Sequence, residues 1–163
     1  MSNDPSTHRM TVLSTEGLYW CLAILISFIA TAAQAQSLVG AQSRKAHAPG
    51  NVDYDLAIDI NQPISGQVTF EPRPIGSGHA IVFQFDGPIS QAGTASATPT
   101  GSASAQINPG NNNEVIVSLT GVADNTRVTV TLSGVNGGAN AFPVSLGFRV
   151  GDFNHTGTVT AAD

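Results

Sequence analysis

Apolar and polar residues alternate along most of the chain after residue 50, which is the period of half-buried β-strands. The alternation is clearest at residues 52–60, 115–119, 128–132 and 144–150. Residues 80–85 form a continuous apolar run instead, which predicts the most deeply buried strand, near the centre of a sheet.

Weaker strand signals and turns complete this pattern. Residues 94–106 consist mainly of Ala, Ser, Thr and Gly around Pro99 and predict two short strands at an edge. Clusters of Gly, Pro, Asn and Asp separate the strands at residues 61–63, 86–88 and 109–113. About eight short strands without a helical segment predict an all-β fold, an antiparallel two-sheet sandwich of the immunoglobulin-like kind, over residues 51–150.

The first 35 residues have the pattern of an export signal. The apolar run at residues 18–30 is short for a membrane span of about 20 residues. The sequence Ala33-Gln34-Ala35 that follows has the small-x-small form of a signal peptidase site. We therefore expect an N-terminal signal helix that is cleaved before Gln36, with an uncleaved membrane anchor as the alternative. Residues 36–50 show little apolar periodicity and predict a linker.

Composition narrows the classes of function. Only 10% of the 163 residues are charged and the net charge is −5, which opposes nucleic-acid binding because that requires a basic face. The single cysteine, Cys21, lies in the expected signal. After cleavage the chain would have no membrane segment, disulfide, thiol nucleophile or cysteine-based zinc site, as in many secreted proteins.

Residues 151–163 fit a calcium loop of the EF-hand type, which supplies oxygens from alternate positions and has Gly at position 6. Val159, at position 8, is the apolar residue that we expect to hold the loop against its neighbours. The expected calcium ligands are Asp152, Asn154, Thr156, Thr158, Thr160 and Asp163, at positions 1, 3, 5, 7, 9 and 12.

The loop resembles the first repeat of type I dockerins, G-D-x-N-x-D/S-G-x-V-x-x-x-D. The agreement is at Gly151, Asp152, Asn154, Gly157, Val159 and Asp163, whereas Thr156 replaces the usual Asp or Ser. The resemblance implies calcium chemistry and a secreted setting. Because neither the helices that bind cohesin nor a second repeat follows in the sequence, we expect no cohesin partner. For the same reason we expect weak calcium binding, with a Kd of about 10⁻⁴–10⁻³ M.

A more diffuse similarity covers residues 81–163. The segments 82–85, 115–121 and 144–150, the last followed by Gly-Asp, look like the sandwich modules that precede dockerin-type ends in secreted bacterial proteins.

Residues that could perform catalysis are scattered. His47 lies in the expected linker, His155 at an outward loop position, and His79 at the start of a strand, without the setting of a Ser-His-Asp site. We expect His79 to be an ordinary strand-end residue. Asp53, Asp55 and Asp59 share one strand face and predict a solvated surface rather than a glycosidase pair. The sequence therefore predicts a protein that is not an enzyme.

Tyr54 is the one aromatic residue in the domain that could stack on a sugar, although its place in the alternation favours core packing. Two functions follow from these patterns. The first is a non-catalytic exported module that interacts with an unknown protein or polysaccharide at the cell surface. The alternative is a component of an extracellular polysaccharide-degrading system.

Overall fold

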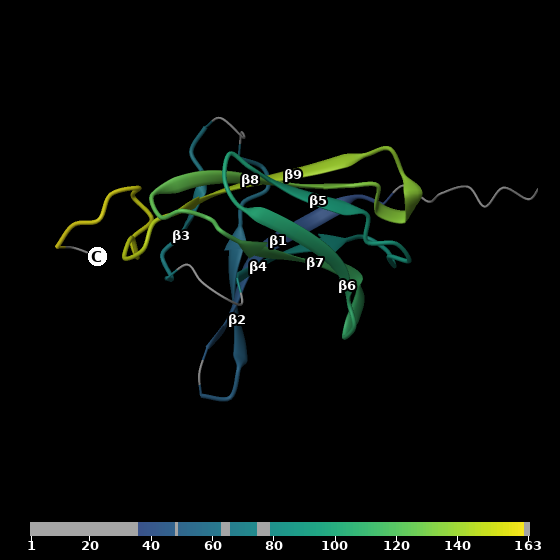
Figure 1. The fold of residues 1–163 in the computed structure, drawn as a ribbon, viewed down its shortest axis with the longest axis horizontal. Coiled ribbons are helices and arrows are strands. Elements are labelled where there is room, and N and C mark those ends of the chain that lie inside the picture. The colour runs from purple at the N-terminus through teal and green to yellow at the C-terminus, as the bar shows by residue number, and fades with distance from the viewer. Residues whose placement is uncertain (1–35, 48, 63–65, 75–78, 162–163) are drawn as a thin grey trace, which may run out of the picture. The chain divides into compact units, whose positions relative to one another are not determined.

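The computed structural model describes residues 36–47, 49–62, 66–74 and 79–161, and these form nine strands and no α-helix. The strands make two sheets, one with the order β2-β1-β4-β7-β6 and one with the order β3-β9-β8-β5 (Figure 1). The predicted all-β class is confirmed. The strands are β1 (Leu38–His47), β2 (Val52–Ile58), β3 (Thr69–Glu71), β4 (His79–Phe85), β5 (Thr94–Thr98), β6 (Ser102–Asn108), β7 (Asn111–Thr120), β8 (Thr126–Ser133) and β9 (Ala141–Phe148), with a 3₁₀ turn at Val135–Gly137.

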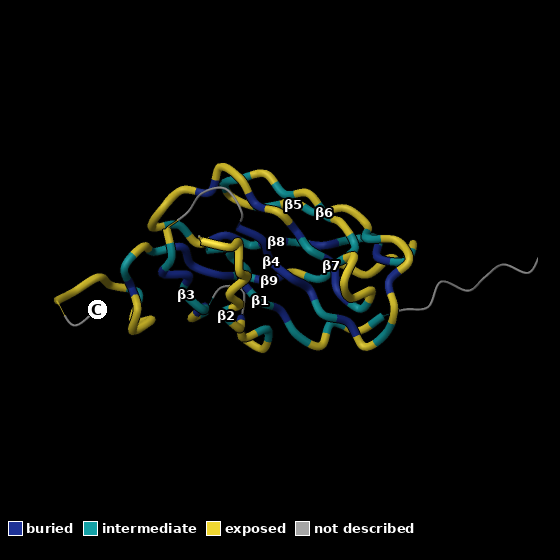
Figure 2. Tube along the Cα trace, turned by 90° about the horizontal axis from the view of Figure 1, so that it is seen from below, coloured by how far each residue is buried: buried dark blue, intermediate teal, exposed yellow. Residues whose placement is uncertain are grey.

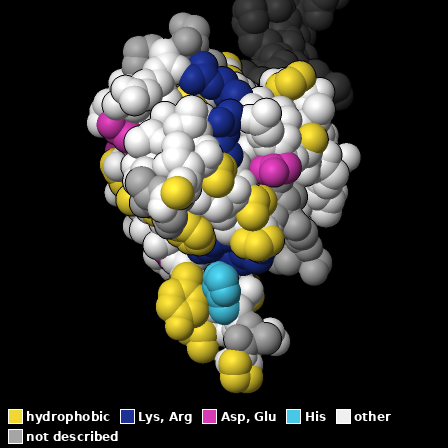
Figure 3. Space-filling model, turned by 90° about the vertical axis from the view of Figure 1, so that its left-hand side faces the viewer, with side chains coloured by type: hydrophobic (Ala, Val, Ile, Leu, Met, Phe, Trp, Pro, Cys, Tyr) yellow, Lys and Arg dark blue, Asp and Glu magenta, His cyan; other side chains and the backbone are white. Residues whose placement is uncertain are grey.

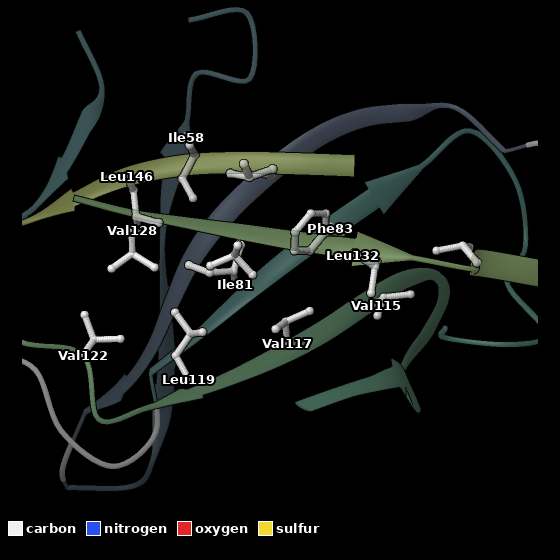
Figure 4. Packing of buried hydrophobic residues seen from close by; sticks show 14 of the residues in the cluster. Ile58, Ile81, Phe83, Val115, Val117, Leu119, Val122, Val128, Leu132 and Leu146 are labelled. Atoms are coloured by element: carbon white, nitrogen blue, oxygen red, sulfur yellow. The ribbon is translucent and has the colours of Figure 1, made fainter. Parts of the chain in front are cut away.

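The two sheets enclose one apolar core, as the alternation predicted. Inward-facing side chains of β4 and β7 meet those of β8 and β9 across this core (Figure 4). Burial is continuous through the middle of the sandwich and is lost at turns and along most of the C-terminal segment (Figure 2). The most deeply buried residues of these strands include Ile81, Phe83, Val115, Val117, Val128, Val130, Leu132 and Leu146.

The positions of three expected strands are confirmed. The apolar run lies in β4, the central strand of the five-stranded sheet. The two strands rich in Ala, Ser and Thr are β5 and β6, and each ends a different sheet. Strong central strands and weak edges follow because a central strand has a hydrogen-bonded neighbour on each side, whereas an edge strand has a neighbour on one side only.

The expected linker is wrong for most of its length. Residues Leu38–His47 form β1, which pairs antiparallel with β2 on one side and β4 on the other. Its inward face carries small residues, and both Ala41 and Ser43 are buried. Because Ala and Ser give a weak hydrophobic signal, the period of this strand is not visible in the sequence. The domain begins before residue 51.

One strand pair departs from the antiparallel arrangement. The chain crosses from β2 in one sheet to β3 in the other, where β3 pairs parallel with β9 over Thr69–Glu71. The four-stranded sheet is therefore mixed. The remaining pairs between described strands are antiparallel.

The face assignment of β2 holds only at one end. Ile58 is buried as expected, but Val52 and Tyr54 are 52% and 57% exposed. The hairpin of β1 and β2 extends away from the sandwich, so the inward face of its tip is uncovered (Figure 1). Core packing of Tyr54 is thus wrong. Asp53, Asp55 and Asp59 are exposed, as the prediction of a solvated face required.

The expected signal peptide and its helix, residues 1–35, lie outside the described residues. None of the residues that the structure describes forms a helix with the length and hydropathy of a membrane span.

Replacing Phe83 by Ala tests the core. Phe83 is fully buried between the sheets, so its truncation should lower the free energy of unfolding by about 3–5 kcal/mol. Phe153→Ala is the matched control, because Phe153 is 63% exposed and should tolerate the change. Chemical denaturation monitored by circular dichroism measures both. Equal stability losses in the two variants would contradict the assigned core.

Candidate functional site

The C-terminal loop is organised around the carboxylate of Asp152. This side chain is fully buried, and its two oxygens accept hydrogen bonds from the backbone N–H groups of Thr156, at 3.0 Å, and Gly157, at 2.7 Å. Gly157 has a φ of +79°, which a residue with a Cβ rarely adopts. The glycine at position 6 therefore makes the sharp turn that the calcium-loop pattern predicted.

Further oxygens gather around the same turn. The side-chain oxygen of Asn154 lies 3.2 Å from the Thr156 N–H that also bonds Asp152. The Thr156 hydroxyl lies 3.1 Å from the hydroxyl of Thr158 and donates to the Thr158 carbonyl at 3.2 Å. Four of the six predicted ligands are thus brought together. Thr160 is exposed at the end of the described loop, and Asp163 lies outside the described residues.

The oxygen set fits calcium in kind but carries little charge. Calcium takes six to eight hard oxygen ligands, and its affinity rises with the number of carboxylates. The described part of the loop supplies carbonyl, amide and hydroxyl oxygens but only the carboxylate of Asp152. Within the described residues, no three His, Cys, Asp or Glu side chains gather into a metal-binding group.

The loop contacts the sandwich through different residues from the expected one. Val159 is exposed rather than buried. Instead, a ring nitrogen of His155 lies 2.9 Å from the carbonyl oxygen of Phe70, and Arg149 donates to the carbonyl of Gly157. Figure 3 faces this end of the domain, and the projection at its bottom is the β1–β2 hairpin, with a histidine beside hydrophobic side chains and with Lys and Arg side chains where it leaves the sandwich.

A second polar cluster lies beneath the β1–β2 hairpin, around Glu71. Its carboxylate is fully buried and accepts hydrogen bonds from the Ser43 hydroxyl and from Nε and Nη2 of Arg73, both at 2.6 Å. Arg73 also donates to the carbonyls of Tyr54 at 2.7 Å and Ser43 at 2.8 Å. One ion pair thus joins β1, β2 and β3.

His79 completes this cluster from β4. Its ring is buried, its Nε2 atom lies 3.8 Å from the Glu71 carboxylate, and it packs edge-on against Phe148. Neither ring nitrogen has a hydrogen-bond partner among the described residues. His79 begins its strand as expected, but it faces a buried acid rather than solvent.

The environment of Glu71 favours its charged form. Burial raises the pKa of Glu71, but the hydrogen bonds from Arg73 and Ser43, with the His79 ring nearby, outweigh burial and hold this pKa well below its usual range. On the surface of the hairpin, hydrogen bonds from Arg44 likewise lower the pKa of Asp55.

A shallow pocket of about 320 Å³ opens above this cluster, lined by His47, Tyr54 and Arg73. The rings of His47 and Tyr54 meet at 89° with centroids 5.2 Å apart, which makes a corner of two aromatic walls. Because Arg73 is already neutralised by Glu71, the pocket presents aromatic faces and a polar floor rather than a free charge.

No family model, curated protein or solved structure matches this chain. Any proposal for the function of this protein therefore depends on the geometry of these two sites.

Glu71 should make the stability of the protein depend on acid pH. The pKa of Glu71 is lowered on folding, so its contribution is complete above the unfolded value of about 4.3 and is lost as pH falls below it. Glu71→Gln should cost about 3–5 kcal/mol at pH 7, because it breaks a buried ion pair.

Unfolding free energies of both proteins between pH 7 and strongly acid pH measure this effect, and their difference should shrink as pH falls. Asp55 and Asp59 also have lowered pKa values, but they contribute equally to both proteins. Parallel curves would contradict the role assigned to Glu71.

Proposed function

We propose that this chain is a non-catalytic, exported β-sandwich module whose C-terminal loop binds calcium weakly, and that it serves as an accessory or interaction protein. The observation that supports the calcium part most directly is the buried Asp152 carboxylate, bonded to the N–H groups of Thr156 and Gly157. This buried carboxylate lies at the start of a turn around which oxygens of the neighbouring loop residues also gather.

The finer fold assignment is also a proposal. An immunoglobulin-like arrangement is supported by nine short strands in sheets of five and four, with the chain passing between sheets at β2–β3, β3–β4, β4–β5, β5–β6 and β7–β8. Such sandwiches act in many exported proteins as carriers of binding surfaces on their edges and loops.

Export is supported by the sequence of residues 1–35, in which an apolar run is followed by Ala33-Gln34-Ala35. We therefore place the mature protein outside the cytoplasm, secreted or at the cell surface. In that setting calcium is available at the concentrations that weak extracellular modules use.

A second function, polysaccharide binding, is supported by Tyr54. An exposed tyrosine beside His47, above a neutralised Arg73, offers an apolar ring face with hydrogen-bonding groups at its edge. Aromatic side chains of this kind are suited to ligands that are apolar on one face and polar at the rim.

Calcium binding is tested by titration calorimetry of the full chain. The expected Kd is about 10⁻⁴–10⁻³ M, and Asp152→Asn should abolish the calcium-dependent heat, because it removes the only carboxylate in the described part of the loop. At about 10 mM calcium the wild-type protein should gain about 1.4–2.7 kcal/mol of stability.

Asp53→Asn is the control for charge, since Asp53 is an exposed aspartate outside the loop. Magnesium should bind more weakly because it demands near-octahedral geometry. Heats that are the same with and without the Asp152 carboxylate would leave the loop as a turn without ion affinity.

Polysaccharide binding is tested by retention of the chain on insoluble polysaccharides. Tyr54→Ala should remove most of the retained protein if the exposed ring is the platform. Val52→Ala, which truncates the neighbouring exposed apolar residue on the same strand, should not. Absence of retention for the wild-type protein would exclude this second function for the polysaccharides used.

A further inference from the structure

The edge strand β3 is held in large part by the segment that follows β9. Its ladder with β9 covers only three residue pairs. Beyond that ladder, the N–H of Arg149 bonds the carbonyl of Glu71 at 3.1 Å, and the N–H of Gly151 bonds the carbonyl of Pro72 at 3.0 Å. The entrance to the calcium loop therefore continues the pairing of β3.

The ring of Phe70, the middle residue of β3, packs against two glycines. A Cβ on Gly147 would lie 2.5 Å from the ring, and a Cβ on Gly157 would lie 3.0 Å from it. Gly147 belongs to β9, whereas Gly157 is position 6 of the loop. The ring therefore touches the loop at the residue whose N–H bonds Asp152.

Arg149 also contacts the Phe70 ring. Its guanidinium carbon lies 5.8 Å from the centre of the Phe70 ring, within the range of a cation–π contact. One terminal nitrogen donates to the carbonyl of Gly157 and the other to the side-chain oxygen of Asn125. Both acceptors are neutral, so the guanidinium positions these groups through hydrogen bonds rather than through an ion pair with them.

We infer that Phe70 and Arg149 are positioning residues for the C-terminal loop, and that the oxygen set around Asp152 and the β3 edge become ordered together. The calcium part of this inference rests on the proposed function, but the coupling between loop and strand does not. By linkage, a cation that orders the loop stabilises the β3 edge, and a change that loosens β3 weakens cation binding.

Amide hydrogen exchange of the calcium-free full chain tests the coupling. Phe70→Leu and Arg149→Met should accelerate exchange of the Thr156 and Gly157 amides by about tenfold or more, because each substitution removes a contact that holds the turn in place. The core amides of Val117 and Val130 should keep their protection. Arg149→Lys should restore part of the protection, since an ammonium can still reach one of the two oxygens.

Matched controls come from the rest of the domain. Phe142→Leu shortens an aromatic residue that packs on Phe85, and Arg44→Lys alters an arginine on the β1–β2 hairpin. Neither should change exchange in the loop. Unchanged exchange of Thr156 and Gly157 in folded Phe70→Leu and Arg149→Met proteins would overturn the inference.

The reciprocal experiment covers the case in which those variants unfold. Asp152→Asn alters a side chain of the loop and none of β3, and it should accelerate exchange of the Arg149 and Gly151 amides, which bond the carbonyls of Glu71 and Pro72. If these two amides keep their wild-type rates while the Thr156 and Gly157 amides exchange faster, the loop and β3 are independent and the inference is wrong.

Calcium titration of the same proteins separates this inference from the proposed function. Wild-type binding with a Kd raised about tenfold in Phe70→Leu and Arg149→Met supports both. Wild-type binding with unchanged Kd in the variants overturns the inference and leaves the proposed function standing. No binding by the wild-type protein refutes the calcium function, and the exchange rates then decide on the coupling alone.

Discussion

The buried ion pair of Glu71 and Arg73 is the constraint on which the join between the two sheets depends. Glu71 belongs to the four-stranded sheet, whereas its hydroxyl partner Ser43 lies in the five-stranded one. A carboxylate removed from water is costly unless donors surround it, and here the guanidinium fork and the Ser43 hydroxyl do so. The carboxylate can lie in the interior only while β1, β2 and β3 stay in place, so this one group requires the arrangement of three strands.

A second buried carboxylate, that of Asp152, follows shortly after a residue that pairs with Glu71. The carbonyl of Glu71 accepts the N–H of Arg149, and Asp152 follows three residues later. The cost of burying a carboxylate is offset differently at the two residues. Glu71 is compensated by a cation, whereas Asp152 is compensated by backbone N–H groups of a tight turn. Asp152 is thus held by backbone N–H groups without an ion pair among the described residues, and a carboxylate held in this way is a ligand of the kind that calcium takes.

The strands and the turn at Asp152 could be predicted from the sequence because their signals are local. Alternation identifies a strand by itself, and the spacing of Asp152, Asn154 and Gly157 specifies a loop within a few residues. The missed features depend on contacts distant in sequence. Ser43 and Glu71 are 28 positions apart, and nothing local marks the small residues of β1 as buried or Glu71 as internal. Tyr54 alternates like a core residue, and only the length of the hairpin relative to the opposite sheet exposes it.

Rigidity and charge contribute separately to ion affinity in loops of this type. The described loop is poor in charge, so whatever affinity it has must come from how firmly its oxygens are held. That firmness is supplied by the sandwich, because the glycine at position 6 lies on the ring of Phe70 and its carbonyl is held by Arg149. The turn is thus held on one side by the end of β9 and on the other by β3. We propose that the edge of the β-sandwich gives this loop support of the kind that flanking helices give in an EF-hand.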